Sequence, residues 1–326
     1  MSYELNKLVK ETLAQYTEKV EEDIIIVSNK DKYYDKISPI DATDYSDKIF
    51  SLMKNLNKTG LEDELIGVLS NGNSFKDALS HTIHDMSNFL EERLFSYVEL
   101  GPEPIKTLFI LSSLLKNGYK IESYTSIDIN PSSETVMREA LSALIPEEKI
   151  NFINSDYANC TANDIPSNGA NKIVTMLGFQ EGNEDPKAIL DILDNITAPK
   201  DIVLSEMQMI SEYNFTPIFD FYNSSNMVEF SSVVFKQIFS ALDSVHGVFL
   251  LPITINSFRC FVAITTETIT SYGEYFNKIF ITNYCLKFSP NQYTAIREER
   301  NLFTVFGSHC TEDQSVMFQL SQKTEV

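Results

Sequence analysis

Two apolar segments that each carry an acid near their end constrain the fold of this chain most. Residues 97–101 (YVELG) end on a glycine, and residues 126–129 (SIDI) carry Asp128 at the end of the next apolar run. In a doubly wound sheet the turn at such a glycine directs backbone N–H groups toward a ligand, and the second acid can accept both ribose hydroxyls. The two segments therefore predict a cleft for a cofactor that contains a nucleoside, bordered by Gly101 and Asp128.

Strand-like and helix-like runs alternate through the middle of the chain. We expect strands at residues 96–100, 122–129, 150–154, 172–177 and 201–205, and helices at residues 105–117, 132–144 and 186–196. Such alternation predicts a parallel sheet. The continuous apolar run KIVTML (172–177) suits a strand that is covered on both faces. The predicted class is α/β, with a doubly wound, mostly parallel, Rossmann-like sheet.

The rest of the chain predicts a second, smaller α+β part. Near the start we expect a helix at 4–20, a short strand at 23–28, irregular or short-helical chain at 29–60, and a helix from Phe75 to Leu94. Beyond about residue 210 aromatic residues are dense and the regular alternation ends. There we expect two helices, then β-rich pieces at 247–252, 257–265 and 275–288, a helix from Ser289 and a closing strand at 315–321.

Charge and cysteine content limit the partners. The chain holds 26 Lys and Arg against 46 Asp and Glu, a formal net charge of -20, and such a field repels phosphate backbones and anionic membranes. The four cysteines show no C-x-x-C spacing, which is typical of reduced thiols. Neither a secretion signal nor an apolar run that could span a bilayer is evident. We expect a cytoplasmic protein with a small-molecule partner, not one that binds nucleic acid or a membrane.

The histidines give only a weak metal signal. His81 and His84 lie three positions apart on an expected helix with Asp85 beside them. The sequence supplies no third convergent ligand, so an ordinary helix surface is the favoured interpretation and no metal is predicted.

Polar residues follow two further strands of the expected sheet. Asp156 and Tyr157 come after the third strand, where an acid can accept a hydrogen bond from an adenine amine and a ring can stack on a purine. Gly178, Gly182 and Asn183 come after the fourth. The glycines let the backbone approach a ligand closely, and the Asn183 amide both donates and accepts. On spacing alone, a plain turn explains the second loop about equally well.

With these motifs the chain resembles the histidine-specific S-adenosylmethionine-dependent methyltransferases of ergothioneine biosynthesis, as a divergent member. The resemblance covers roughly residues 60–320 and rests on the order and spacing of motifs. The family motifs ELGSGSS-x-KT, VDVS, GDF, FLGSTIGN and TE-x-S-x-KYTP correspond here to residues 99–101 with 106–107, 127–130, 155–157, 176–178 with 182–183, and 282–290.

The resemblance implies two domains and a set of cofactor contacts. Residues 61–208 and 286–326 would form an S-adenosylmethionine-dependent methyltransferase domain, and residues 1–60 and 209–285 a substrate-binding domain. Asp128 would hold the ribose. The other cofactor-binding positions implied are Asp156 and Tyr157 at the adenine, Gly101 and Lys106 near the methionine part, and Glu99 and Gly178 in the matching loops.

The resemblance also implies a substrate pocket. Asn183 and Tyr222 would contact the amine and carboxylate of an amino acid, and Asn283 with Cys285 would line the pocket for its side chain. For Tyr222 considered without the resemblance, a core aromatic on a helix is the favoured interpretation.

Three departures from the family pattern affect the expected activity. The glycine-rich loop is reduced to residues 101–104 (GPEP), in which two prolines remove N–H donors and Glu103 adds negative charge. The paired tyrosines of the family are replaced by residues 72–75 (GNSF). The glutamate and serine that hold the imidazole become Asn283 and Cys285, and a neutral amide gives no charge-assisted hydrogen bond. Histidine is therefore not the expected substrate.

The sequence thus predicts an N-methyltransferase that uses S-adenosyl-L-methionine on an amino acid or an amino-acid-like small molecule. No catalytic residue is assigned, because methyl transfer requires mainly orientation and exclusion of water. Two alternatives stay open: a catalytically degenerate scaffold subunit, and an aminocarboxypropyl transferase of the nicotianamine-synthase type. A nicotinamide dehydrogenase is disfavoured because the loop lacks G-x-G-x-x-G. A homodimer is a further option that the sequence leaves open.

Overall fold

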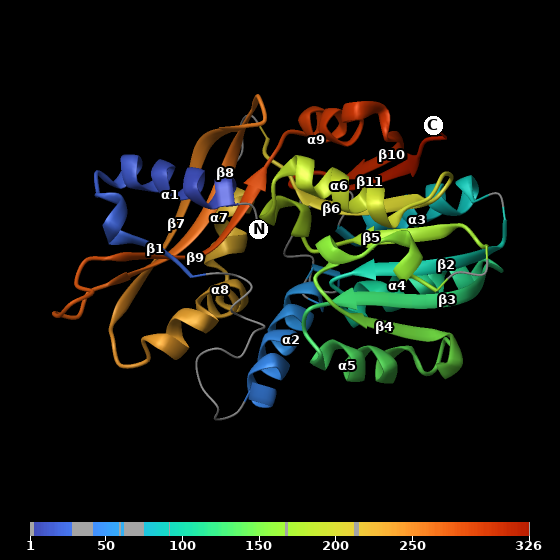
Figure 1. Cartoon of the computed structure of the whole chain (residues 1–326), viewed down its shortest axis with the longest axis horizontal. Coiled ribbons are helices and arrows are strands. Elements are labelled where there is room, and N and C mark those ends of the chain that lie inside the picture. Colours follow the sequence, from blue (N-terminus) through green and yellow to red (C-terminus); the bar gives the residue numbers. More distant parts are fainter. Residues whose placement is uncertain are drawn as a thin grey trace.

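The computed structural model describes residues 3–27, 42–58, 60–61, 75–90, 92–166, 169–211 and 215–325. Its strands form two sheets, a larger one and a smaller one, that lie next to each other along the long axis of the molecule (Figure 1).

The larger sheet has seven strands in the order β10-β11-β6-β5-β2-β3-β4. They are β2 (Leu94–Leu100), β3 (Lys120–Asp128), β4 (Ile150–Asn154), β5 (Lys172–Met176), β6 (Ile202–Gln208), β10 (Phe303–Cys310) and β11 (Val316–Lys323). Strands β2 to β6 pair in parallel, and β11 pairs antiparallel with both β6 and β10. The structure thus confirms the expected doubly wound, mostly parallel α/β sheet.

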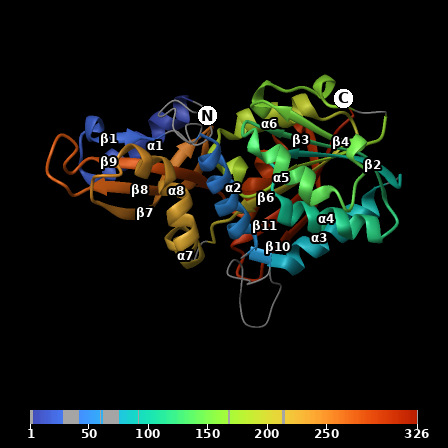
Figure 2. The ribbon, with the colours of Figure 1, turned by 90° about the horizontal axis from the view of Figure 1, so that it is seen from below.

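Helices cover both faces of this sheet. Successive side chains of a strand point to opposite faces. Accordingly, Tyr97 of β2 packs in one apolar cluster with the helix α4 (Pro104–Lys116), and Val98 packs in another with α6 (Pro186–Ile196). The helices α3 (Phe75–Phe89) and α5 (Ser132–Leu141) lie on the α4 side (Figure 2).

The smaller sheet has four strands in the order β1-β9-β8-β7. Its strands are β1 (Ile24–Ile26), β7 (Ser244–Ile255), β8 (Phe258–Ile269) and β9 (Ile279–Lys287), and its helices are α1 (Tyr3–Thr17), α7 (Thr216–Asn223) and α8 (Ser225–Ile238). Helix α1 packs on β1 and β7, and α8 packs on β8 and β9. This arrangement confirms the smaller α+β part. The assignment of the two parts as cofactor and substrate domains, with the boundaries given above, stays a prediction.

Two expectations for single elements are wrong. Within residues 29–60, expected to be irregular or short-helical, Ala42–Lys58 form the helix α2; residues 28–41 lie outside the described part. Helix α2 contacts α4, α5 and α8, and so touches helices of both sheets (Figure 2). The single closing strand is a hairpin of β10 and β11, preceded by α9 (Pro290–Arg297). The outer strand β10 was missed because its side chains are mostly half-exposed and follow no alternating apolar pattern.

None of the helices in the described part of the chain combines the length and the apolar character needed to cross a membrane.

Candidate functional site

A cavity of about 270 Å³ lies at the carboxyl ends of the parallel strands. It opens where β2 has β3 on one side and β5 on the other, the switch point at which open α/β sheets bind ligands. Elements of both sheets and helix α2 line it. Its polar and glycine lining comprises Asn57, Gly60, Gly101, Glu103, Lys106, Asp128, Asn130, Asp156, Tyr157, Gly178, Gln180, Asn183, Glu184, Glu206, Tyr222, Asn283 and Cys285.

The turn after β2 needs its glycine. Gly101 has a φ of +67°, a backbone conformation that residues with a side chain rarely adopt. A Cβ at this position would collide with the side chain of Gln180, whose Nε2 donates a hydrogen bond to the Gly101 carbonyl oxygen at 3.1 Å. The turn is therefore fastened to the loop after β5, and both border the cavity.

Glu103 closes the N-terminus of α4 with its own side chain. Its carboxylate accepts hydrogen bonds from the backbone N–H groups of Lys106 and, at 2.9 Å, of Ile105. Burial raises the pKa of Glu103 to about 7. A helix N-terminus that is open binds phosphate readily. Here a carboxylate occupies those donors, so this position is unsuited to the pyrophosphate of a dinucleotide.

Asp128 borders the cavity at the end of β3. Its Oδ1 accepts a hydrogen bond from the backbone N–H of Asn130 at 2.9 Å, and burial raises the pKa of Asp128 to about 6. Asp156 and Tyr157 border the cavity after β4, where the Asp156 Oδ1 accepts a hydrogen bond from Ala158 N at 3.1 Å. The three side chains are thus arranged along one rim.

A buried ion pair crosses the floor of the cavity. Lys106 Nζ lies 2.5 Å from Glu206 Oε2, and the same oxygen accepts a hydrogen bond from the Gly178 N–H at 2.9 Å. The side chain of Lys106 thus lines the cavity as expected, but its ammonium is bound to a protein carboxylate.

The predicted substrate residues meet on the side of the cavity nearer the small sheet. Asn183 ends the 3₁₀-helix Gln180–Asn183 after β5, Tyr222 lies on α7, and Asn283 and Cys285 lie on one face of β9. Burial raises the pKa of Tyr222 well above its usual value. The structure therefore brings these four residues together around one cavity.

A second buried ion pair holds the loop that carries Asn183. Glu181 Oε1 accepts from Arg297 Nη2 at 2.6 Å and from the Ser205 hydroxyl at 2.5 Å, and Glu181 Oε2 accepts from the Tyr293 hydroxyl at 2.7 Å. These contacts come from α9 and β6, on the side of the loop away from the cavity.

One expected cofactor residue needs correction. Glu99 is only 1% exposed and does not line the cavity. Its carboxylate accepts hydrogen bonds from the Thr107 hydroxyl at 2.6 Å and the Tyr124 hydroxyl at 2.8 Å, and burial raises its pKa to about 8. Because side chains alternate along β2, Glu99 points to the α4 face, where its hydrogen bonds connect β2 with β3 and with α4. All the other predicted site residues line the cavity.

Several lining residues had no signal in the sequence. Met53 and Leu56 come from α2, and Met227 and Phe230 come from α8, far from the motifs. Of the segment 72–75 that replaces the paired tyrosines, residues 72–74 lie outside the described part, and Phe75 lines the cavity.

The histidine cluster has protein partners. Asp85 Oδ2 lies 2.7 Å from His309 Nε2, and His84 Nε2 lies 3.0 Å from the Asn88 amide. In the described ranges, no group of three His, Cys, Asp or Glu side chains is placed to hold a metal ion.

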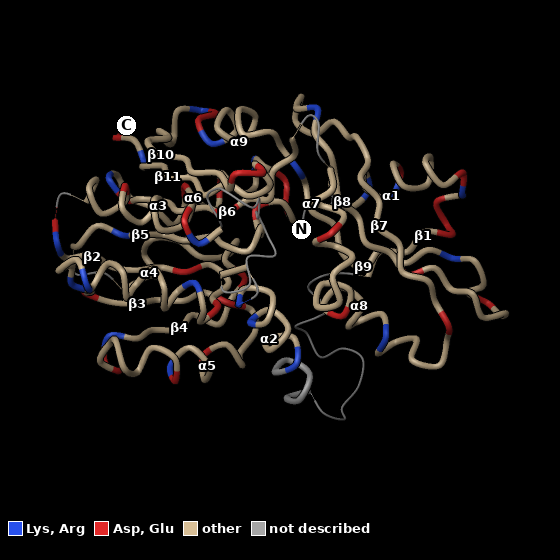
Figure 3. The backbone as a smooth tube through the Cα atoms, turned by 180° about the vertical axis from the view of Figure 1, so that it is seen from behind, with Lys and Arg blue, Asp and Glu red and all other residues tan. Residues whose placement is uncertain are grey.

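The electrostatic character of the cavity is acidic. Five acidic side chains line it, whereas Lys106 is the only Lys or Arg among the described lining residues. Acidic positions also gather in the middle of the molecule, between the two sheets (Figure 3). Such a site favours a ligand with positive charge over one with phosphate groups. The five are Glu103, Asp128, Asp156, Glu184 and Glu206.

No protein-family model matches the chain, and no curated protein matches it in sequence. Among solved structures it is similar to an S-adenosylmethionine-dependent methyltransferase from Clostridium acetobutylicum (9% identity, TM-score 0.44, 86% of this chain and 99% of that one covered). It is also similar to the CcbJ methyltransferase from Streptomyces caelestis (8%, 0.42, 76% and 90%). A third is the 1,6-didemethyltoxoflavin-N1-methyltransferase from Burkholderia thailandensis (8%, 0.40, 88% and 93%). At these values the likenesses assign no family or reaction to the chain.

Proposed function

We propose that the chain is an S-adenosyl-L-methionine-dependent N-methyltransferase that acts on an amino acid or an amino-acid-like small molecule other than histidine. One observation carries the proposal: Asp128, Asp156 and Tyr157 line the same cavity as Asn183 and Asn283. In this proposal Asp128, Asp156 and Tyr157 contact the nucleoside of the cofactor. The amides of Asn183 and Asn283 contact the acceptor in the same cavity. A small-molecule partner is part of this proposal; a homodimer stays a prediction.

The chemistry of the cavity fits this cofactor. The Asp128 carboxylate can accept hydrogen bonds from ribose hydroxyls, and the Tyr157 ring offers a face for a purine. The acidic lining of the cavity complements a positively charged sulfonium. The capping of α4 by Glu103 disfavours a pyrophosphate, which supports this cofactor over a dinucleotide.

When bound, the sulfonium supplies an electrophilic methyl group. The chain's own residues then have to place an acceptor nitrogen and exclude water. Asn183 and Asn283 have amides that orient the acceptor, and Tyr222 is 2% exposed and closes the cavity beside them. Apolar side chains of α2 and α8 cover the same side and keep it dry.

The acceptor side argues against histidine. Asn283 and Cys285 offer no carboxylate to an imidazole N–H, so they give an imidazole no charge-assisted hydrogen bond.

The proposal is tested in two steps with the full chain. Calorimetry with S-adenosylmethionine, S-adenosylhomocysteine and NADH should give heat for the first two ligands only. Incubation with methyl-labelled S-adenosylmethionine and a panel of amino acids and amines should then give a methylated product. No heat with either sulfur ligand would favour the scaffold alternative, and a product heavier by an aminocarboxypropyl group would favour the other transferase.

A further inference from the structure

Three aromatic side chains form a wall on the acceptor side of the cavity. Phe179 lies in the loop after β5, Phe221 and Tyr222 lie on α7, and all three line the cavity. Their rings meet edge to face: the centroids of Phe179 and Phe221 are 5.5 Å apart, and those of Phe221 and Tyr222 are 5.0 Å apart. Because such contacts are favourable, the three rings form one packed surface, which we call the aromatic wall.

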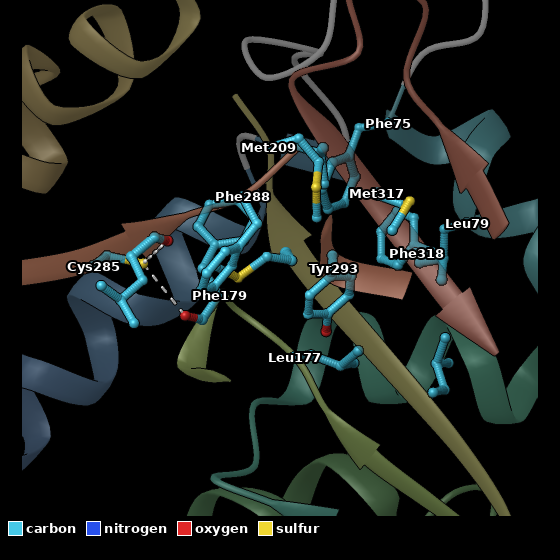
Figure 4. Close-up of a cluster of buried hydrophobic side chains, with 14 of the residues drawn as sticks. Phe75, Leu79, Leu177, Phe179, Met209, Cys285, Phe288, Tyr293, Met317 and Phe318 are labelled. Carbon is cyan, nitrogen blue, oxygen red and sulfur yellow. Dashed lines mark hydrogen bonds between the residues drawn. The ribbon is translucent and has the colours of Figure 1, made fainter. Parts of the chain in front are cut away.

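The aromatic wall is fixed from the side of the small sheet. The Cys285 thiol donates a hydrogen bond to the Phe179 carbonyl oxygen at 3.6 Å, and Figure 4 shows this contact as a dashed line. Phe179 has a φ of +63°, which is uncommon for a residue with a large side chain. Strained backbone persists where the surrounding structure holds it, and it is frequent at ligand sites.

Helices α2 and α8 add apolar side chains to the same side of the cavity. Met53 and Leu56 come from α2, and Met227 and Phe230 come from α8. The two helices pack against each other. None of the described lining residues of either helix is charged. This side of the cavity can therefore bury an apolar group of a ligand.

Protein carboxylates already occupy the donors that could receive a carboxylate of the acceptor. Lys106 is the only Lys or Arg among the described lining residues, and its Nζ lies 2.5 Å from Glu206 Oε2. The Gly178 N–H donates to the same oxygen at 2.9 Å. The N–H groups at the start of α4 donate to the Glu103 carboxylate. Lys106 is, in addition, one of the residues assigned to the cofactor.

A second lysine near the aromatic wall does not change this balance. Lys287 Nζ lies 5.5 Å from the ring centroid of Phe179 and 5.2 Å from that of Tyr222. Lys287 is 0% exposed and does not line the cavity. Its Nζ donates a hydrogen bond to Cys285 Sγ at 3.0 Å, and burial lowers the pKa of Lys287. This amine therefore offers no positive charge to the space that the acceptor occupies.

We propose that the acceptor is an amine that carries an apolar group and no carboxylate, and is not an amino acid itself. The inference rests on the proposed function and narrows its substrate class. The apolar group packs against the aromatic wall and the apolar side chains of α2 and α8. The nitrogen lies near the Asn183 amide and near Glu184, the next residue of the same loop, which also lines the cavity. A carboxylate on this acceptor would be buried without a counter-charge, which is costly.

The charge of the cavity suits such an amine. The acidic lining attracts a positively charged ligand, and aromatic rings attract an ammonium group. Before methyl transfer the ammonium loses one proton to water, and the electron pair of that N–H bond stays on nitrogen. This pair forms the bond to the methyl carbon, and the electron pair of the broken S–C bond stays on sulfur.

The test compares ligands that differ in the carboxylate. Phenethylamine and phenylalanine, tryptamine and tryptophan, and isoamylamine and leucine are titrated into the full chain by calorimetry, with and without S-adenosylhomocysteine. We expect amines of this panel to bind, each at least about tenfold more tightly than its amino acid. Binding of no amine, a smaller preference or a preference for the amino acid would overturn the inference.

Phenylalanine methyl ester separates charge from size. The ester keeps the bulk of the amino acid but has no negative charge, so we expect it to bind more like phenethylamine than like phenylalanine. Rejection of the ester together with phenylalanine would show that the cavity excludes bulk and not charge, which would also overturn the inference.

Variants of two aromatic residues locate the binding. Phe221→Ala removes one ring of the aromatic wall and should weaken phenethylamine binding at least about tenfold, and Phe221→Leu, which keeps an apolar side chain on α7, should weaken it in the same direction. Phe215→Ala is the matched control and should bind like wild type, because Phe215 directly precedes α7, is 39% exposed and does not line the cavity. Phenethylamine binding that neither Phe221 variant weakens would reflect attachment to the acidic surface and would overturn the inference.

Failure of this inference is distinct from failure of the proposed function. S-adenosylhomocysteine titrated alone tests the cofactor. Transfer of the labelled methyl group to amino acids and to none of the amines would overturn this inference and leave the proposed function in place. If S-adenosylhomocysteine does not bind, the proposed function fails, and the amine titrations without it still decide whether the cavity prefers amines.

Discussion

Lys106 and Glu206 are joined by an ion pair of 2.5 Å although they lie 100 positions apart in the chain. The pair connects α4 to β6, and the Gly178 N–H that binds the same carboxylate connects the loop after β5. Both side chains are at most 2% exposed. One carboxylate thus fixes three of the segments that border the cavity.

Removing that carboxylate should destabilise the protein strongly. Glu206→Leu leaves the Lys106 ammonium buried without a counter-charge, and breaking a buried pair in this way costs about 3–5 kcal/mol. The double variant Lys106→Met with Glu206→Leu should recover much of the loss, because an apolar pair leaves no unpaired charge. The free energy of unfolding in urea measures both. As a control, Lys48→Met breaks the exposed Lys48–Glu229 pair and should cost at most about 1 kcal/mol. A loss of that small size for Glu206→Leu would contradict the prediction.

The contrast between these residues shows what a sequence can predict. Gly101 and Asp128 border the cavity as predicted, because each follows an apolar strand and parallel strands end at one edge of the sheet. That they bind a cofactor stays a prediction. Local sequence also predicts the position of Lys106, because this residue lies in the helix that directly follows the turn at Gly101. Its partner Glu206 was not predictable, since it depends on how β6 aligns with α4.

The errors have a similar origin. The motif predicts that Glu99 contacts the cofactor. Because side chains alternate along β2, however, the Glu99 carboxyl points to the face of the sheet that α4 covers, where it binds the Tyr124 hydroxyl. The role of α2 depends on packing between helices from both sheets, and no motif in residues 42–58 indicates such packing.

The buried carboxyl of Glu99 should make stability depend on pH. Its pKa in the folded protein is about 8 against an ordinary value of 4.5, so the folded state binds the extra proton between these values. The stability that the protonated group contributes is complete below about pH 4.5 and is lost as the pH rises through about 8. Glu99→Gln removes the titration and keeps an amide that can bond to Thr107 and Tyr124.

The measurement is urea unfolding of wild type and Glu99→Gln across this pH range. The wild type should lose stability relative to the variant by on the order of 1.4 kcal/mol per pH unit within the window. Glu139→Gln, at an exposed position, is the control and should show no such trend. A difference between wild type and Glu99→Gln that is constant with pH would show that Glu99 does not titrate there.

Asp128→Asn should weaken cofactor binding with little effect on folding. The amide retains the bond from the Asn130 N–H but loses the charged acceptor, and hydrogen bonds to charged groups contribute about 1.5–3 kcal/mol. Calorimetry with S-adenosylhomocysteine should therefore show affinity reduced about 10- to 100-fold. Asp164→Asn, at the end of the 3₁₀-helix Ala162–Asp164 and outside the cavity, should bind like wild type. Equal loss in both variants would point to general unfolding.

The same carboxyl gives a pH dependence of binding. Because the pKa of Asp128 is raised to about 6 by burial, protonation below that pH removes its charge. Affinity of the wild type for S-adenosylhomocysteine should fall as the pH falls through about 6, and Asp128→Asn should lack that transition. Parallel pH curves for the two proteins would mean that Asp128 does not contact the ligand.

Gly182→Ala should separate the two halves of the cavity. The added Cβ would meet Cys285 Sγ, Met207 Cε at 2.8 Å and the Leu286 carbonyl oxygen at 2.9 Å. The backbone oxygen cannot move aside cheaply, so the loop that carries Asn183 has to shift, at a typical overpacking cost of about 1–3 kcal/mol. Asp128 and Asp156, which we propose to contact the nucleoside, lie on other loops and should be unaffected. We therefore expect nearly unchanged binding of S-adenosylhomocysteine in calorimetry, together with at least tenfold weaker use of any acceptor that the labelled panel identifies. If both ligands were lost together, the acceptor and cofactor sites would not be separable, and the placement of the acceptor beside Gly182 would be wrong.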